Sequence, residues 1–289
     1  MPPTAGRPSR VRWTVLALMC LAGFVAYVLR KNMSVAGAAM IGELGISELQ
    51  FGIVLAAFTW GYGLAQIPGA LAGERFGARR TLAGAALAWG ILTLATALVP
   101  GTEGVSAAAC VAALVVLRFL MGVAQAPLYP VTGGISTVVW FPTTRWALVN
   151  GLSTTALTLG AAAAAPAVAW LAFTVGWRQS FLALAPLGFV VAGLGWWLYR
   201  DDPAAHRGVG PEELALIRAG RAAGEDPGRE RVSWRVVARR PGVLALTASY
   251  FCVNYVFYLF FNWFFYYLVN VRGVPPQLGG AFVSGQWMV

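Results

Sequence analysis

The chain has 289 residues, of which 58% are hydrophobic and only 11% are charged. A soluble globular domain carries about 25% charged residues, so this composition excludes an ordinary cytosolic enzyme and a disordered chain. The net charge is +10, but the basic residues are scattered between apolar runs of membrane-spanning length, which excludes a nucleic-acid binder. We therefore expect an integral membrane protein with the lipid bilayer as its surroundings.

Seven apolar runs are long enough to cross a bilayer core of about 30 Å, which takes roughly 20 helical residues. They cover residues 13–39, 51–72, 81–100, 107–139, 146–173, 178–199 and 243–270, and an eighth begins near 278. The first run could imitate a signal peptide, but Arg30 and Lys31 interrupt it before the small residues that a cleavage site requires. The fold class that follows is an all-α bundle in which the first span is retained.

The basic residues are divided unequally between the two sides of these spans. Sixteen lie before the first span or in the loops after the second, fourth and sixth, whereas Arg178 and Arg272 lie on the other side. By the positive-inside rule, the N-terminus and the 200–242 loop are cytoplasmic, in a multi-pass protein of the cell's inner (plasma) membrane. Within that loop, Pro211, Glu212 and Glu213 predict the start of a short surface helix, because proline and acids suit a first turn.

Six spans, a long charged loop and further spans are typical of a two-bundle transporter. We predict a cytoplasmic N-terminus (1–12), a six-helix bundle (13–199) built from two three-helix repeats, a cytoplasmic linker (200–242) and the start of a second bundle (243–289). On this organisation the sequence is expected to be a fragment or a C-terminally truncated product.

No cluster of side chains in the sequence suits a metal ion or a hydrolase. Cys20, Cys110 and Cys252 lie in apolar runs, and the one histidine, His206, lies in a polar loop. We therefore expect no disulfide framework, no metal site and no cofactor. A coupling ion (H⁺ or Na⁺) or a counter-anion stays open as an alternative.

Three cations, Arg30, Lys31 and Arg118, lie inside the predicted spans, and none of the eleven acids does. A charge in hydrocarbon costs about 3 kcal/mol on insertion scales, so an unpaired one predicts a functional site, here for an anion. Two interpretations of Arg30 and Lys31 stay open. Either the first span ends at Leu29 and both side chains snorkel to the outer interface, or the helix continues and they bind a ligand. For Arg118, a structural arginine that bonds neighbouring carbonyls stays as open as a ligand.

Polar side chains also recur at three- and four-residue spacing along five spans, which places them on one face of each helix. These stripes are Tyr27, Arg30/Lys31 and Ser34; Phe58, Tyr62 and Gln66; Arg118, Gly122, Gln125 and Tyr129; Thr154, Thr155 and Thr158; and Asn254, Tyr258, Asn262 and Tyr266. Such faces join helices to one another or line a shared polar cavity. Because five spans carry them, we favour the cavity.

The loop between the second and third spans resembles the signature loop of the major facilitator superfamily. It reads Gly69-Ala-Leu-Ala-Gly-Glu74-Arg75-Phe-Gly77-Ala-Arg79-Arg80, with Glu74 where aspartate is usual. Arg118, in Leu117-Arg118-Phe-Leu-Met-Gly122, matches the family's arginine motif of the fourth helix. The resemblance implies that the loop, together with Arg118 and Arg145, locks the inner gate by charge contacts between two bundles.

Two branches of that family are similar to this chain. Phe58 to Pro68, Gln125 to Pro130 and Gly176 to Phe181 resemble the anion:cation symporters, which carry sugar acids and other carboxylates. In that branch the residue equivalent to Arg30 binds the substrate carboxylate, and Tyr62 occupies a substrate-contacting position. Tyr27 to Asn32 instead resembles the organophosphate:phosphate antiporters.

The chain departs from both branches. Leu29 and Gln125 stand where proton-coupled symporters often carry acids, and no arginine stands near Phe257, where the phosphate antiporters carry one. Proton coupling through the first bundle and a phosphoryl substrate are therefore both in doubt.

We predict a secondary active transporter of a small organic anion, a carboxylate or sugar acid, that works as a monomer by alternating access. The expected substrate-binding residues are Arg30, Lys31, Tyr27, Tyr62, Gln125, Tyr129, Tyr258 and Asn262. A phosphate-type antiporter and a transporter-like ligand sensor are the alternatives. An integral-membrane enzyme is disfavoured, because no general acid or base lies at membrane depth.

Overall fold

The computed structural model describes residues 9–101, 106–219, 236 and 238–287, and within these ranges the chain is helical without strands. Seven helical segments of this described part are long and apolar enough to cross a membrane. They are Val11–Leu44, Glu48–Phe76, Ala78–Ala97, Ala107–Trp140, Thr143–Thr174, Trp177–Leu198 and Pro241–Val271. The seven predicted spans are confirmed, with ends shifted by only a few residues.

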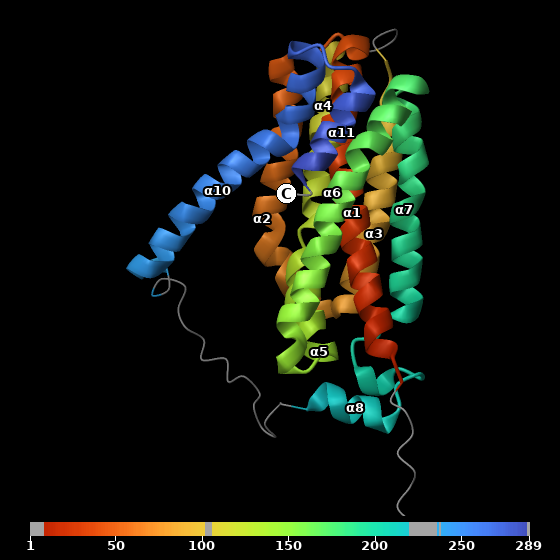
Figure 1. Ribbon diagram of the computed structural model, residues 1–289, viewed down its shortest axis with the longest axis vertical. Helices are drawn as coiled ribbons and strands as arrows, with labels where there is room; N and C mark the ends of the chain where they lie inside the picture. Colours follow the sequence, from red (N-terminus) through yellow and green to blue (C-terminus); the bar gives the residue numbers. More distant parts are fainter. Residues whose placement is uncertain (1–8, 102–105, 220–235, 237, 288–289) are drawn as a thin grey trace, which may run out of the picture.

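The spans are built from the following elements (Figure 1). The first six comprise α1 (Val11–Leu44), α2 (Glu48–Phe76), α3 (Ala78–Ala97), α4 (Ala107–Gln125) with η1 (Pro130–Ser136) and α5 (Thr137–Trp140), η2 (Thr143–Arg145) with α6 (Trp146–Thr174), and α7 (Trp177–Leu198). After them come η3 (Pro203–Ala205), α8 (Pro211–Arg218), α10 (Pro241–Tyr266) with η4 (Tyr267–Val271), and α11 (Pro276–Gln286). The short helix α8 confirms the prediction made from Pro211, Glu212 and Glu213. Residues 220–235 of the predicted linker lie outside the described residues.

Local sequence fixes the sharp turns between the spans. Gly45 ends α1 with a φ of 58°, and Gly77 separates α2 from α3 with a φ of 86°. Both values lie in the region that glycine enters without a steric penalty. Between α1 and α2, Ser47 Oγ accepts from Gln50 N at 3.2 Å while Gln50 Oε1 accepts from Ser47 N at 2.8 Å. This capping box satisfies two backbone donors at the start of α2.

The six helices pack chiefly in three pairs: α1 along α6, α2 along α4, and α3 along α7. Glycines make these contacts close. A Cβ added to Gly61 of α2 would lie 2.1 Å from Phe119 O of α4, and one added to Gly160 of α6 would lie 2.4 Å from Phe24 O of α1. Small residues let membrane helices approach in this way. The pairing is unchanged when the first three spans are exchanged with the second three, which is the pattern expected of two three-helix repeats.

Helix α10 contacts the bundle at one end only. We call the end that carries Gly77 and α8 the linker end, and the end that carries Gly45 the far end. Toward the far end, Phe261, Phe265 and Tyr266 are buried, whereas α10 is exposed over most of its length near Pro241. Figure 1 shows the same helix diverging from α1–α7 toward Pro241. Within the described residues, α10 therefore packs on the bundle through its far-end half.

Candidate functional site

Arg30 lies in the middle of α1, a continuous helix of 34 residues. This excludes the alternative in which the first span ends at Leu29. The side chain is only 4% exposed. Its Nε donates to Gln125 Oε1 of α4 at 3.1 Å, and Gln125 Nε2 donates to Ala26 O at 3.1 Å. Gln125 therefore orients the guanidinium from the next helix, which leaves the terminal nitrogens as the part of the group that can meet a ligand.

Three aromatic rings surround this guanidinium. Its Cζ lies 4.8 Å from the ring centroid of Tyr27, 4.6 Å from that of Phe58 and 4.6 Å from that of Tyr62. Phe58 and Tyr62 stack on one another with centroids 5.9 Å apart. A cation over an aromatic face is stabilised without a counter-charge. The rings thus hold Arg30 in place while leaving it positively charged, as an anion site requires.

Lys31 faces a different neighbour. It is fully buried, its Nζ donates to Phe261 O of α10, and it lies 4.4 Å from the centroid of the Phe261 ring. Tyr27 contacts the same ring edge-on, with centroids 6.2 Å apart. Lys31 therefore joins α1 to α10, whereas its neighbour Arg30 contacts Gln125 and the aromatic rings.

Arg118 lies in α4, as its fourth-helix motif predicted, and its side chain contacts the same Phe58 ring as Arg30. Its side chain is 4% exposed, and its Cζ lies 4.9 Å from the Phe58 centroid. Its buried Nε has no hydrogen-bond partner among the described residues. Arg118 is thus a second cation next to Arg30.

The other predicted binding residues, Tyr258, Asn262 and Tyr129, differ in how closely they approach Arg30. Tyr258 contacts the Phe257 and Phe261 rings and is close enough to Arg30 to interact with it electrostatically. Asn262 is half-buried one turn further along α10, and no hydrogen bond in the described structure connects it to the cluster. Tyr129 is half exposed and its hydroxyl lies 3.3 Å from Thr154 Oγ1. Tyr129 thus borders α6, and within the described chain no hydrogen bond or ring contact joins it to Arg30.

The signature loop is held by the end of α7. Arg79 N donates to Asp201 Oδ1 at 2.9 Å, and Arg79 Nε donates to Trp196 O at 2.7 Å, with the guanidinium 4.4 Å from the Trp196 ring. A Cβ at Gly77 would lie 2.6 Å from the Asp201 carboxylate. These contacts fix the loop within the first bundle. Of the other predicted loop and gate residues, Gly69 packs on Pro127, Arg75 lies 5.4 Å from the Phe76 ring, and Glu74, Arg80 and Arg145 lie at the linker end.

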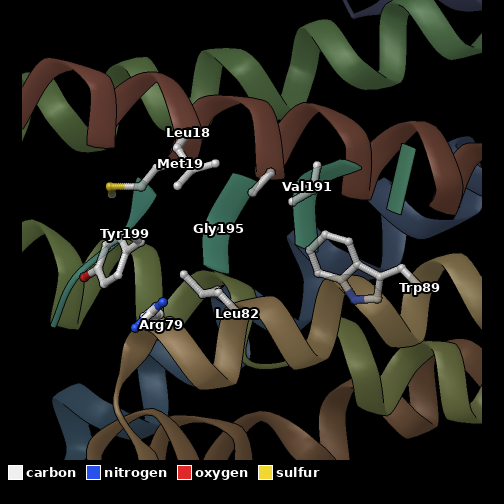
Figure 2. A pocket seen from close by; sticks show the side chains of 9 residues that line it. Leu18, Met19, Arg79, Leu82, Trp89, Val191, Gly195 and Tyr199 are labelled. Carbon is white, nitrogen blue, oxygen red and sulfur yellow. The ribbon is translucent and has the colours of Figure 1, made fainter. Parts of the chain in front are cut away.

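Figure 2 shows a cavity between α1, α3 and α7 that is separate from the Arg30 cluster. Its lining is almost entirely apolar, with Leu18, Met19 and Leu82 among the residues and Arg79 at one end. At the same end Tyr199 is buried, which raises the pKa of its hydroxyl, and that hydroxyl donates to Ser136 Oγ at 2.8 Å. The cavity offers no set of polar groups for a charged substrate.

The sequence reasoning missed Phe261 and left Phe58 out of the expected binding residues. Both are apolar. A stripe defined by polar side chains does not include Phe261, and it assigns no role to Phe58. Their function becomes visible only when the helices are assembled, because each ring lies against a cation. In the sequence, each of these aromatic residues lies one helical turn from a polar residue of its stripe, and this spacing could have identified them.

A family model described as the Major Facilitator Superfamily matches residues 19–289. The chain belongs to this superfamily. It is therefore a multi-pass membrane protein, and its all-α fold agrees with the resemblance drawn from the signature loop.

Curated relatives in this superfamily are longer than the chain. A probable galactarate/D-glucarate transporter of Escherichia coli (strain K12) is 31% identical over 284 residues, covering 94% of this chain and 61% of that protein. A probable sulfoacetate transporter of Cupriavidus necator is 29% identical over 280 residues, covering 95% and 61%. A D-galactonate transporter of Escherichia coli O6:H1 is 28% identical over 293 residues, covering 98% and 65%. The chain thus spans less than two thirds of these superfamily relatives.

A solved structure supports the fold of this superfamily member. The crystal structure of a bacterial homolog to the human lysosomal transporter Spinster, in an inward-facing and unoccupied conformation, matches with a TM-score of 0.75 and 19% sequence identity. The match covers 98% of this chain and 60% of that one. At this identity the likeness concerns the arrangement of the helices.

Proposed function

We propose that this protein is a secondary active transporter, and not an enzyme, that moves a small organic anion by alternating access. The observation that carries the proposal is Arg30, a guanidinium buried at mid-membrane depth, oriented by Gln125 and enclosed by three aromatic rings. The acids of the described spans, Glu43, Glu48 and Glu74, lie in the end turns of α1 and α2, away from Arg30 in the middle of α1. An anion bound next to Arg30 would supply the missing charge.

The substrate we infer is a carboxylate, with sugar acids as the leading class. A guanidinium presents two parallel donors that match a carboxylate. Relatives named for galactarate, D-glucarate and D-galactonate are also similar to the chain in sequence. Tyr27, Tyr62 and Tyr258 supply hydroxyls near Arg30, which suits a ligand rich in hydroxyls. A phosphoryl substrate is less favoured, because α10 contains no arginine or lysine.

Location and assembly belong to the same proposal. We infer that the protein lies in the cell's inner membrane as a monomer with its N-terminus and linker in the cytoplasm, from the asymmetry of its basic residues. Leu29 and Gln125 have no titratable group, so a coupling proton, if one is used, would bind elsewhere; coupling to Na⁺ and exchange against a counter-anion are the alternatives.

Binding of matched ligands to the purified protein tests the site. D-Galactonate and galactitol both have six carbons and a chain of hydroxyls, but only galactonate carries a carboxylate. We expect calorimetric titration to show binding of galactonate and none of galactitol. Arg30→Lys keeps the charge but loses the planar fork, so affinity should fall about tenfold or more. Arg30→Gln should abolish binding.

Two results would contradict the proposal. Equal affinity for galactonate and galactitol would show that charge is not recognised, and an Arg30→Gln variant with parental affinity would remove Arg30 from the site. Uptake of radiolabelled galactonate into vesicles separates a transporter from a sensor, because a sensor binds the ligand without moving it across the membrane.

A further inference from the structure

The second buried arginine of the site has no role in the function proposed so far. Arg118 and Arg30 lie 4.9 and 4.6 Å from the centroid of the same Phe58 ring, so their guanidinium carbons are no further apart than the sum of these distances. Both side chains are 4% exposed. Two like charges this close in a buried setting repel one another and stabilise neither.

A structural arginine would be expected to donate to neighbouring carbonyls. In the described residues the buried Nε of Arg118 has no acceptor, and leaving a buried donor without a partner is unfavourable. The nearby side-chain acceptor Gln125 Oε1 is already bonded to Arg30 Nε. What Arg118 lacks is an acceptor, and a negatively charged one would also relieve the repulsion from Arg30.

The packing of α2 against α4 keeps Phe58 next to Arg118. A Cβ on Gly122, one turn from Arg118, would lie 2.2 Å from Phe58 O and 2.7 Å from Tyr62 N. The backbones therefore touch beside the ring, and Phe58 cannot move away from Arg118 without separating the helices. The α2–α4 contact thus fixes the backbone next to Arg118 relative to Phe58.

We propose that Arg118 is a second carboxylate-binding residue, so that the site is built for a dianion such as a sugar diacid. Arg30 binds one carboxylate and Arg118 binds the other, and both guanidinium groups lie next to the Phe58 ring. A monoacid leaves Arg118 unpaired, so it binds more weakly. This inference rests on the proposed anion-transport function and names its substrate class.

Galactarate and galactonate form a matched pair of probes, because they differ only in a carboxylate against a hydroxymethyl group at one end. Calorimetric titration of the purified protein should show that galactarate binds about tenfold or more tightly than galactonate, as expected for one more charge-assisted hydrogen-bonded contact. Arg118→Gln should lower the affinity for galactarate to that for galactonate and leave galactonate within about twofold of the parent. Arg30→Gln should lose both ligands.

Arg272→Gln, which removes an exposed cation from the turn after α10, serves as the charge-matched control and should change neither affinity. If Arg118→Gln is not recovered as a folded protein, Arg118→Met carries the same expectations, because it fills a similar volume without a polar group to satisfy.

The outcomes separate this inference from the function on which it rests. A parent that binds both acids equally, or an Arg118 variant that weakens both ligands alike or neither, overturns the dianion site while leaving the anion transporter intact. If the parent protein binds neither galactarate nor galactonate, and Arg30→Gln changes nothing, the proposed function itself is wrong.

Discussion

Arg30 and Lys31 are neighbours in sequence but lie about 100° apart around the helix axis. Arg30 therefore faces α2 and α4, where Gln125 and the aromatic rings are, and Lys31 faces Phe261 of α10. The burial of both residues follows from the continuous helix, since side chains in the middle of a long span cannot reach an interface. Their different partners follow from the helices that happen to flank α1.

Glu213 is a second residue whose role depends on its surroundings. It is fully buried, although its neighbours in the linker are polar. One carboxylate oxygen accepts from Ser9 Oγ and, at 3.2 Å, from Val11 N, and the other accepts from Arg12 N at 3.1 Å. A side chain of α8 thus caps the start of α1, where backbone donors lack partners and a negative charge is favoured.

Glu213→Gln should loosen this attachment. The amide nitrogen would turn donors toward the backbone donors of α1, so we expect a loss of about 1–2 kcal/mol in the docking of α8. Trypsin should then cleave faster after Arg10 and Arg12. Glu212→Gln, one residue away and only half-buried, is the matched control and should keep the parental cleavage rate. Equal rates for all three proteins would show that Glu213 does not hold α1 and α8 together.

At the scale of elements, close backbone contact decides which helices pair. α2 meets α4 at Gly61 and Gly122, and α6 meets α1 at Gly160. The predicted fourth span is not one regular helix, because α4 ends at Gln125 and a π-helix runs from Pro130 to Ser136. Pro127 and Pro130 lack the backbone donors that a continuous α-helix needs there. Apolar length alone could not show this interruption.

The α2–α4 contact gives a prediction with an internal control. Gly61→Ala would place a methyl group 2.1 Å from Phe119 O, a backbone atom that cannot move aside. We expect a loss of about 1–3 kcal/mol, as for other overpacked contacts, seen as a lower unfolding temperature in detergent. Gly63→Ala lies on the same helix with nothing within 4 Å of the added carbon. A Gly61 variant as stable as the Gly63 variant would contradict the proposed close contact.

At the scale of the whole molecule, α10 meets the described bundle at the far end and diverges from it toward the linker end. Tyr266 of α10 donates to Glu48 of α2 at 2.5 Å. Also at the far end, Trp177 Nε1 of α7 donates to Glu43 of α1 at 2.8 Å, and Arg178 pairs with the same carboxylate. The linker-end half of α10 has no comparable contacts within the described chain.

The orientation of the molecule can be tested by labelling introduced cysteines in intact cells. We expect Leu49→Cys at the far end to react with a membrane-impermeant maleimide, because Leu49 is 77% exposed. Arg218→Cys in α8 should react only after the cells are permeabilised. Both belong in a background in which Cys20, Cys110 and Cys252 are replaced. Labelling of the Arg218 variant in unpermeabilised cells would reverse the orientation inferred from the basic residues.

The sequence by itself determined the spans, the signature loop and the helix at Pro211, and it left two positions open for Arg30. Each of these depends on local features: the length of an apolar run, the cost of a charge in hydrocarbon, or the preference of proline and acids for a helix start. Gln125, Tyr27 and Tyr62 were predicted from helical spacing, which places them on the correct face.

Only the tertiary structure decided which partners those faces meet. The contact of Lys31 with Phe261, the second cation of the site at Arg118 and the cap formed by Glu213 all join residues that are distant in sequence. Helical spacing fixes the direction of a side chain relative to its own helix, but it carries no information on which other helix lies in that direction. That choice is made by the packing of whole helices, through backbone contacts such as those at Gly61 and Gly122.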